Sequence, residues 1–372
     1  MKNIYAQFRL EGRVINCTRT GGGHINRTYL VVTAKPRLYI LQWLNGQVFK
    51  NLTGLMRNVV AVTDYLHQRV DDPRGALTLI PTLTGEPYLT TPEGDCWRMY
   101  DYILDSVCLE SAETAEDLRQ SGVAFGMFQN QLADFPAATL TETIPHFHDT
   151  PDRFRLFHEA IRNDATCRLE SVRDVVRRYL AHEAEADALH SLLRSGAIPL
   201  RVTHNDTKLT NVMLDDATRR PLCVIDLDTV MPGLAAHDYG DAIRFGASTA
   251  AEDEPDLSKV SLSLELYEAF TEGFLSACGD RLTEKEIETL PLGAKLMTLE
   301  CGVRFLTDYL NGDVYFATSR PGQNLDRALT QLTLAEDMEK KWDEMNAIIA
   351  RLKKKSDHSR EKAHLLTAVK GE

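Results

Sequence analysis

The stretch RVTHNDTKLTNVMLDDATRRPLCVIDLDTVMPG, residues 201–233, decides how the rest of the sequence is interpreted. Short apolar runs alternate in it with polar, turn-forming segments, and this alternation predicts a β-hairpin over 211–228. Folding the hairpin at its midpoint places Asn211 opposite Asp226. Both side chains then lie at the open end of the hairpin, next to Asp206, and this is where we look for chemistry.

Crowding acids at one place needs a physical reason. Two carboxylates about 4 Å apart repel by roughly 4 kcal/mol at an effective dielectric constant near 20. Asp206, Asp226 and Asp228 can therefore gather only with a cation, a shared proton or a basic partner. Asn211 adds a neutral oxygen, and an all-oxygen set suits Mg²⁺. The hypothesis is that Asn211 and Asp226 hold the metal while Asp206 acts as a base; the alternative is a polar hairpin whose acids cap turns and helices.

Length and composition narrow the class of protein. The chain has 372 residues, which suggests two domains, and its net charge of −12 argues against a protein that coats nucleic acid. No apolar run is long enough to span a membrane, and the N-terminal sequence resembles no secretory signal. The seven cysteines are scattered without a CxxC pair, so we expect reduced thiols and a cytoplasmic location.

The two ends of the chain differ in their expected secondary structure. Residues 13–100 are typical of strands, with a glycine-rich link at 20–26 and one helix near 52–70. After residue 106 long helical patterns dominate, interrupted by the hairpin region. The sequence therefore predicts a β-rich part followed by a mainly helical part.

The motif H-x-D-x(4)-N at 204–211, followed by Ile225–Asp226, resembles the catalytic and metal segments of the aminoglycoside phosphotransferase family. Other segments, among them HFHDTPDRF, DYGDAIRFGAST and ECGVRFLTDYLNGDVYF, resemble the bacterial N-acetylhexosamine 1-kinases over about residues 10–350. The resemblance implies an α+β, two-lobed protein-kinase-like fold, with a small antiparallel sheet lobe and a large mainly helical lobe. It implies a nucleotide-binding lobe with its hinge at 1–103 and a second lobe at 104–372 that includes the hairpin region 200–233.

The resemblance also implies the reaction, the transfer of a phosphoryl group from ATP to the anomeric hydroxyl of an N-acetylhexosamine. Asp206 would accept the proton of that hydroxyl, while Asn211 and Asp226 would hold Mg²⁺ against the nucleotide phosphates. The residues expected to bind the nucleotide are Gly21, Gly22, Gly23, Gln42, Tyr100, Asp101, Tyr102 and Ile103. Gln42 stands where kinases usually carry a phosphate-pairing lysine, so either Arg57 or Lys50 supplies the missing charge or phosphate binding is weaker.

A further group of residues is expected to bind the sugar: His24, Asp206, Asp228, Phe245, Glu300, Arg304 and Tyr315. Glu300, Arg304 and Asp308 recur every four residues and so share one face of a mostly apolar helix, which favours a pocket over a surface ladder. Asp238 and Asp241 are expected to tie down the loop that carries Asp206.

Several alternatives stay open. The pair His146 and His148 could bind zinc, although local hydrogen bonding is the simpler interpretation because no third ligand is evident. The acceptor could instead be an aminoglycoside, choline or homoserine, and the protein could be a nucleotide-binding pseudokinase. We expect a monomer whose partners are ATP and a small sugar, with no nucleic acid and no membrane.

Overall fold

The computed structural model describes residues 1–21 and 25–355, which pack into two compact units. The first unit contains Met1–Cys108, Asp134–Pro145 and Asn211–Pro232. The second contains Leu109–Ala133, His146–Thr210 and the chain from Gly233 onward. Hairpin residues that the sequence placed in the helical lobe thus pack with the sheet-containing unit. The reason is that the strand following the hinge pairs with the hairpin.

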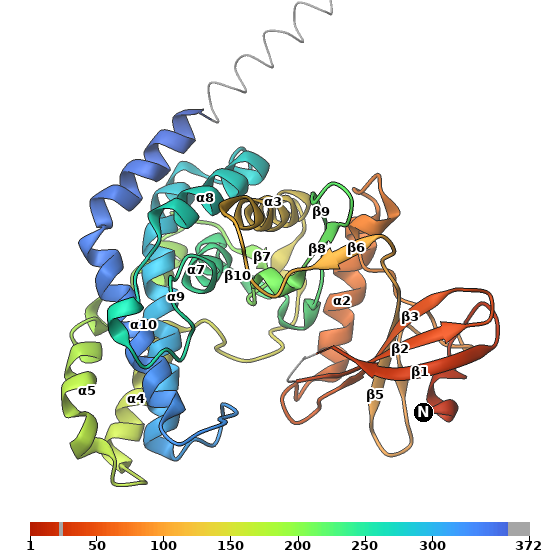
Figure 1. Ribbon diagram of the computed structural model, residues 1–372, viewed down its shortest axis with the longest axis horizontal. Helices are drawn as coiled ribbons and strands as arrows, with labels where there is room; N and C mark the ends of the chain where they lie inside the picture. Colours follow the sequence, from red (N-terminus) through yellow and green to blue (C-terminus); the bar gives the residue numbers. More distant parts are fainter. Residues whose placement is uncertain (22–24, 356–372) are drawn as a thin grey trace, which may run out of the picture. The chain divides into compact units, whose positions relative to one another are not determined.

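A five-stranded antiparallel sheet forms the core of the first unit, in the order β1-β2-β3-β5-β4 (Figure 1). The strands are β1 (Val14–Thr20), β2 (Arg27–Thr33), β3 (Leu38–Leu44), β4 (Leu89–Thr90) and β5 (Cys96–Asp101). Val31, Leu41 and Met99 have no exposed surface and lie in one apolar cluster of this sheet. Successive side chains of each strand point to opposite faces of the sheet, so these three residues share the face that the cluster covers.

Among the described residues of this unit, the α-helices are the short α1 (Lys2–Tyr5) and the longer α2 (Leu52–His67). The Asn51 side chain caps α2 by accepting a hydrogen bond from the N–H of Gly54. Residues 77–82 contribute isolated bridges, Leu79 with Tyr100 and Thr82 with Phe8, because Pro81 has no N–H to donate to a continuous ladder.

A second, three-stranded sheet in the first unit has the order β6-β8-β9. Its strands are β6 (Ser106–Cys108), β8 (Val212–Asp215) and β9 (Pro221–Val224). β8 and β9 form the predicted hairpin, and β6 pairs with β8 in antiparallel register. Two further strands of three residues are β7 (Arg201–Thr203) and β10 (Met231–Gly233).

The second unit is built from helices. They are α3 (Ala115–Gln131), α4 (Thr150–Asn163), α5 (Arg173–Leu180), α6 (Ala188–Arg194), α7 (Ala235–Gly246), α8 (Leu264–Cys278), α9 (Glu284–Asn311) and α10 (Gln323–Lys340). The long helix α9 packs against α4, α7 and α10 (Figure 1). A Cβ atom at Gly240 would lie 2.3 Å from the carbonyl oxygen of Gly293, so glycine is what lets α7 approach α9 closely.

The predicted division into a small antiparallel sheet lobe and a large helical lobe is confirmed. In the described part of the chain, no helix has the length and apolar character needed to cross a bilayer.

Candidate active site

The segment that follows β7 is a loop held by two acids of α7. The Asp238 carboxylate accepts hydrogen bonds from the backbone N–H groups of His204 (2.9 Å) and Asn205 (2.8 Å). The Asp241 carboxylate accepts one from the N–H of Thr207 (3.0 Å). Because charge-assisted hydrogen bonds of this kind are strong, the two acids fix the backbone of the loop, as the sequence suggested.

This loop, residues 204–207, is called the Asp206 loop below, and it places a carboxylate beside a lysine. Asn205 has a φ of +64°, a left-handed conformation that asparagine tolerates better than most residues. The Asp206 carboxylate lies 2.9 Å from Nζ of Lys208, and both side chains are about one third exposed. Burial lowers the pKa of Lys208, but the Asp206 carboxylate outweighs this effect and the pKa is raised. A base and a cation therefore stand side by side.

A buried charge network supports the loop from α7. Arg244 donates to Asp241 from Nε (3.1 Å) and Nη2 (2.9 Å), and its Nη1 donates to Glu252 (2.8 Å). Burial disfavours the ionised form of Asp241, but Arg244 and then Lys208 outweigh it, so the pKa of Asp241 is lowered. Asp241 therefore stays a charged acceptor for the loop.

In the first unit, the strand pairing of the hairpin is shifted by one residue from the pairing that the sequence predicted. Val212 pairs with Val224, and the N–H of Ile225 donates to the carbonyl oxygen of Asn211 at 2.9 Å. Asn211 therefore lies opposite Ile225 rather than Asp226, because the hairpin is centred on Thr218 instead of after it. The side chains of Asn211 and Asp226 still belong to the same end of the hairpin.

Asp226 follows β9 with a φ of +60°, a second left-handed residue at a predicted functional position. Such backbone persists in folded proteins where the surroundings over-determine it, and it is enriched at active sites. One amide oxygen and one carboxylate oxygen at this end of the hairpin form a donor set that suits a hard divalent cation. Asn211 and Asp226 thus have the chemistry that a magnesium ion requires of its ligands.

The first unit also contains a buried basic residue that the sequence reasoning missed. Arg98 of β5 is buried, forms an ion pair with Asp228 and donates from Nε to Oε1 of Gln42 (2.9 Å). The candidates proposed from the sequence, Arg57 and Lys50, are both exposed. The basic group beside Gln42 is therefore Arg98.

This ion pair changes the interpretation of Asp228, which the sequence assigned to substrate binding. The carboxylate is buried, and besides Arg98 it accepts a hydrogen bond from Nδ2 of Asn26. A carboxylate with two internal partners is poorly placed to receive a sugar hydroxyl, so we assign Asp228 to holding Arg98. One feature of the sequence could have identified Arg98: it is a charged residue within the largely apolar strand CWRMYD.

In the second unit, one face of α9 carries the predicted series Glu300, Arg304 and Asp308. Glu300 has no exposed surface, and its oxygens accept from Nδ1 of His148 (2.9 Å) and Oγ1 of Thr150 (2.7 Å). Burial raises the pKa of Glu300, but His148 and then Arg304 outweigh it, giving a value of about 2. Glu300 is therefore an ionised group enclosed by the protein, which indicates support rather than direct sugar contact.

Arg304 lies one turn further along α9, between two aromatic rings. Its guanidinium carbon is 5.3 Å from the ring centre of Phe147 and 5.5 Å from that of Phe316. A second arginine is near: Arg153 donates to the carbonyl oxygen of Phe147 at 2.7 Å. Burial and then the charge of Arg304 lower the pKa of Arg153. Two cations thus meet at the same aromatic residue.

Asp308, one turn beyond Arg304, organises the segment that follows α9. Its carboxylate accepts from the consecutive backbone N–H groups of Val314 (3.0 Å), Tyr315 (2.8 Å) and Phe316 (2.9 Å). The Tyr315 ring remains 65% exposed although its backbone is fixed. The predicted sugar-binding tyrosine is therefore presented on a rigid loop.

Comparison with known proteins identifies the family. The model of the phosphotransferase enzyme family APH matches residues 16–271. The chain belongs to this phosphotransferase family. Its fold is similar to that of an amicoumacin kinase in complex with AMP-PNP and Ca²⁺, with a TM-score of 0.61, 13% identity and 91% of each chain covered. The predicted protein-kinase-like fold class is thereby confirmed.

Two further solved structures support the same fold. An aminoglycoside phosphotransferase from Alicyclobacillus acidocaldarius matches with a TM-score of 0.59 and 14% identity over 96% of both chains. A microcompartment-associated aminopropanol kinase matches with a TM-score of 0.58 and 15% identity over 92% of this chain and 96% of that chain.

The segment predicted to be the hinge already uses part of its backbone internally. The N–H of Asp101 donates to Thr78 (2.9 Å), and the N–H of Tyr102 donates to Leu38 (3.2 Å). The carbonyl oxygen of Ile103 accepts from Oγ of Ser106 (2.7 Å). Adenine contacts in this segment would therefore have to use other groups, or share these acceptors.

The remaining predicted residues differ in what the structure says of them. Gly21 lies just after β1 with a φ of +77°, which favours glycine. Gly22, Gly23 and His24 lie outside the described residues. Phe245, near the end of α7, is 37% exposed, which leaves part of its ring available for contact in this phosphotransferase.

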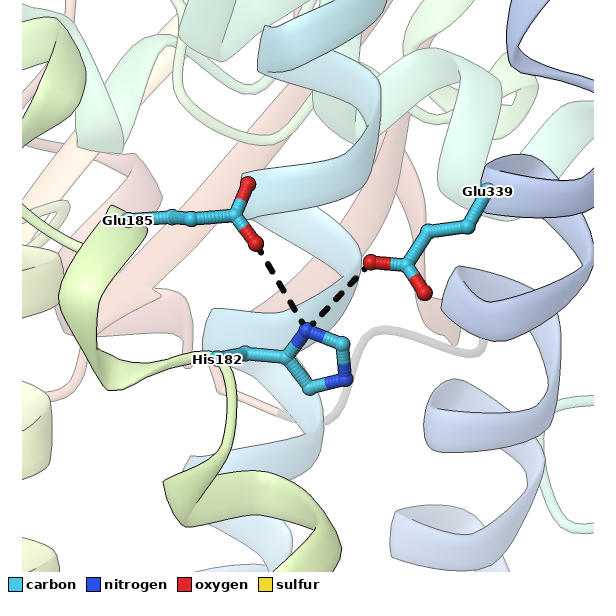
Figure 2. Close-up of side chains that lie close together, drawn as sticks. All are labelled: His182, Glu185 and Glu339. Carbon is cyan, nitrogen blue, oxygen red and sulfur yellow. Dashed lines mark ion pairs between the residues drawn. The ribbon is translucent and has the colours of Figure 1, made fainter.

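A group outside these sites, His182, Glu185 and Glu339, brings three potential metal ligands within 4.8 Å of one another in the described part of the chain. Figure 2 shows His182 between the two carboxylates, with Nδ1 at 3.7 Å from Glu185 and 3.4 Å from Glu339. Lys295 forms ion pairs with both acids. Because both acids already pair with Lys295, we assign the cluster to joining α9 and α10 with the segment before α6.

Proposed function

We propose that this phosphotransferase moves the terminal phosphoryl group of ATP to the anomeric hydroxyl of an N-acetylhexosamine, giving ADP and the hexosamine 1-phosphate. The observation that carries phosphoryl transfer is the Asp206 loop, in which a carboxylate and a lysine lie 2.9 Å apart on a backbone anchored by two acids. The resemblance of the surrounding sequence to N-acetylhexosamine 1-kinases supports the choice of acceptor.

The role of each group follows from its chemistry. Asp206 takes the proton of the acceptor hydroxyl as the oxygen bonds to phosphorus, and the bond to the leaving oxygen of ADP breaks on the opposite side. Lys208 can meet the negative charge of the phosphoryl oxygens at that moment. A fixed base and a fixed cation reduce the reorganisation that the reaction requires.

Asn211 and Asp226 would hold the magnesium ion that accompanies ATP. When bound, such an ion neutralises phosphate charge and orients the transferring group. Among the described residues, Arg98 is the buried cation beside Gln42. Its ion pair neutralises the charge of Asp228, so Asp228 adds little negative charge near Asp226. We propose that this arrangement replaces the usual lysine in setting the charge of the nucleotide side.

The acceptor class is supported by the arginines at Phe147. In the described residues Arg304 has no ion pair, and Nε of Arg153 is buried without a hydrogen-bond partner. Glu300, an acid that acts on both arginines, is already bound to His148. A cation-rich surface of this kind disfavours polycationic aminoglycosides and choline and favours a neutral acceptor rich in oxygen atoms.

A coupled assay of ADP release tests the proposal over N-acetylglucosamine, N-acetylgalactosamine, glucose, galactose, choline, homoserine and kanamycin. We expect turnover with the N-acetylhexosamines, loss of activity when Mg²⁺ is chelated, and a product with phosphate on the anomeric carbon by ³¹P and ¹³C NMR. Turnover with choline, homoserine or kanamycin, and none with the sugars, would show that the proposed acceptor is wrong. Binding of Mg-ATP with no turnover on any acceptor would favour a pseudokinase.

Under this proposal the protein acts as a monomer on diffusible sugar and ATP, without nucleic acid. Mass photometry of the purified protein, with and without Mg-ATP, is the measurement that checks the monomeric state.

A further inference from the structure

The residue before the proposed base has an unusual backbone whose N–H and carbonyl oxygen both have partners, as does its side-chain amide nitrogen. Asn205 is left-handed, its N–H donates to Asp238, and its Nδ2 donates to the carbonyl oxygen of Thr203 (3.3 Å). Its own carbonyl oxygen faces Nε2 of His148 at 3.4 Å. Since that carbonyl belongs to the peptide bond leading into Asp206, its orientation sets the direction in which Asp206 leaves the loop.

His148 is itself fixed from helix α9. Its Nδ1 lies 2.9 Å from the Glu300 carboxylate, and the second Glu300 oxygen accepts from Thr150. The imidazole is also packed against the rings of Phe147 and His237, with ring centres 4.6 Å and 5.4 Å away. Both ring nitrogens face oxygen acceptors, and only the doubly protonated imidazolium can donate to both.

We propose that His148, buttressed by Glu300, is a positioning residue that holds the Asn205 carbonyl and thereby aims the Asp206 carboxylate at the acceptor. This inference rests on the proposed role of Asp206 and adds to it a connection from α9 to the base. Glu300 and Arg304 are one turn apart on the same face of α9. In this proposal that face positions the Arg304 cation near the acceptor and, through Glu300 and His148, orients Asp206.

The alternatives for His148 are less consistent with its contacts. A zinc ligand needs a ring nitrogen with a lone pair directed at the metal, whereas both nitrogens of His148 face oxygen atoms. The other histidine of the HxH pair, His146, has a largely exposed side chain that pairs with Asp149 at 3.0 Å. The two histidines therefore have different partners. Local hydrogen bonding describes His146, whose partner Asp149 is three residues away, whereas His148 contacts Glu300 and Asn205 in distant segments.

The experiment compares His148→Ala, His148→Gln and His148→Asn with the matched control His146→Ala in steady-state kinetics. Misplacing a reacting group by about 1 Å costs on the order of 100-fold, so we expect kcat of His148→Ala to fall about 10- to 100-fold. The KM values for ATP and acceptor should stay within about threefold, and His146→Ala should resemble the wild type. Gln places its donor near the position of Nε2 and Asn near that of Nδ1, so Gln should restore more kcat than Asn.

Hydrogen exchange of the peptide covering residues 204–207 gives a readout that does not depend on turnover. We expect its amides to exchange about tenfold faster in His148→Ala, with little change in the rest of the second unit. Unchanged kcat and exchange, a change in acceptor KM alone, or faster exchange throughout the unit would each overturn the positioning role.

Failure of the proposed function looks different. In that case the wild type transfers no phosphoryl group to any acceptor of the panel, and the exchange measurement still decides whether His148 holds the loop. If His148→Ala does not fold, the comparison of the Gln and Asn variants carries the test.

Discussion

Replacing Arg98 by methionine should destabilise the first unit strongly, because it leaves the Asp228 carboxylate buried without its cation. The Arg98 and Asp228 side chains are 1% and 4% exposed, so water cannot substitute for the lost partner. Breaking a buried ion pair from one side costs about 3–5 kcal/mol. For a domain of typical size, 1 kcal/mol shifts Tm by about 2–4 °C, so we expect a loss of roughly 6–20 °C.

Urea unfolding followed by tryptophan fluorescence measures the loss of stability in the first unit specifically. Trp43 and Trp97 lie in the first unit and Trp342 in the second, so a Trp342→Phe background restricts the signal to the unit that contains the pair. The two units need not unfold together, which makes a local probe necessary.

The double variant Arg98→Met/Asp228→Leu separates the pair from its surroundings. Replacing a buried pair by apolar residues is often close to neutral, so the double variant should be more stable than Arg98→Met alone. As a control, Arg37→Met breaks the exposed pair with Glu11 in the same unit and should leave the urea midpoint unchanged. Additive losses in the double variant, with a coupling energy below about 0.5 kcal/mol, would refute the reasoning.

Three other predictions concern the second unit. Asp206→Asn should abolish turnover while leaving ATP affinity, measured by calorimetry, within a few-fold; an equal loss of both would make Asp206 a metal ligand or a structural residue. Arg304→Ala should mainly raise the acceptor KM, and an unchanged KM would remove Arg304 from the acceptor site. His237 is buried, and burial together with His148 lowers its pKa to about 3. As pH falls from about 6.5 towards 4.5, the unfolded chain therefore gains a proton that the folded chain does not, and stability should fall by about 1.4 kcal/mol per pH unit. His237→Leu should flatten that part of the stability profile, and an unchanged slope would contradict the assignment.

The sequence predicted those parts of the molecule that depend on local patterns. The hairpin at 211–228 followed from alternating apolar runs, and only its register differed by one residue, since the centre of a turn is not visible in composition. The hydrogen bonds from the Asp206 loop to Asp238 were also expected, because an acid close to such a loop in the sequence can hold its backbone. The specific sugar and nucleotide contacts remain predictions.

What the sequence could not supply are pairings between distant segments. His148 and Glu300 are 152 positions apart, and no local period connects them. The ion pair of Arg98 and Asp228 depends likewise on β5 and the end of the hairpin packing in one unit. An interpretation from local spacing and the family resemblance therefore assigned Glu300 and Asp228 to the ligand, whereas the fold uses both to hold other side chains.

The contact of Asp308 with three successive amides bears on how acceptor preference could change. The Tyr315 ring is exposed, while the conformation of its loop is maintained by a carboxylate from a neighbouring helix and not by the ring itself. Side chains at this position can therefore be exchanged without remodelling the main chain around them. Under the proposed function, saturation mutagenesis at Tyr315, with Asp308 kept, is accordingly a direct test of whether this position sets acceptor preference.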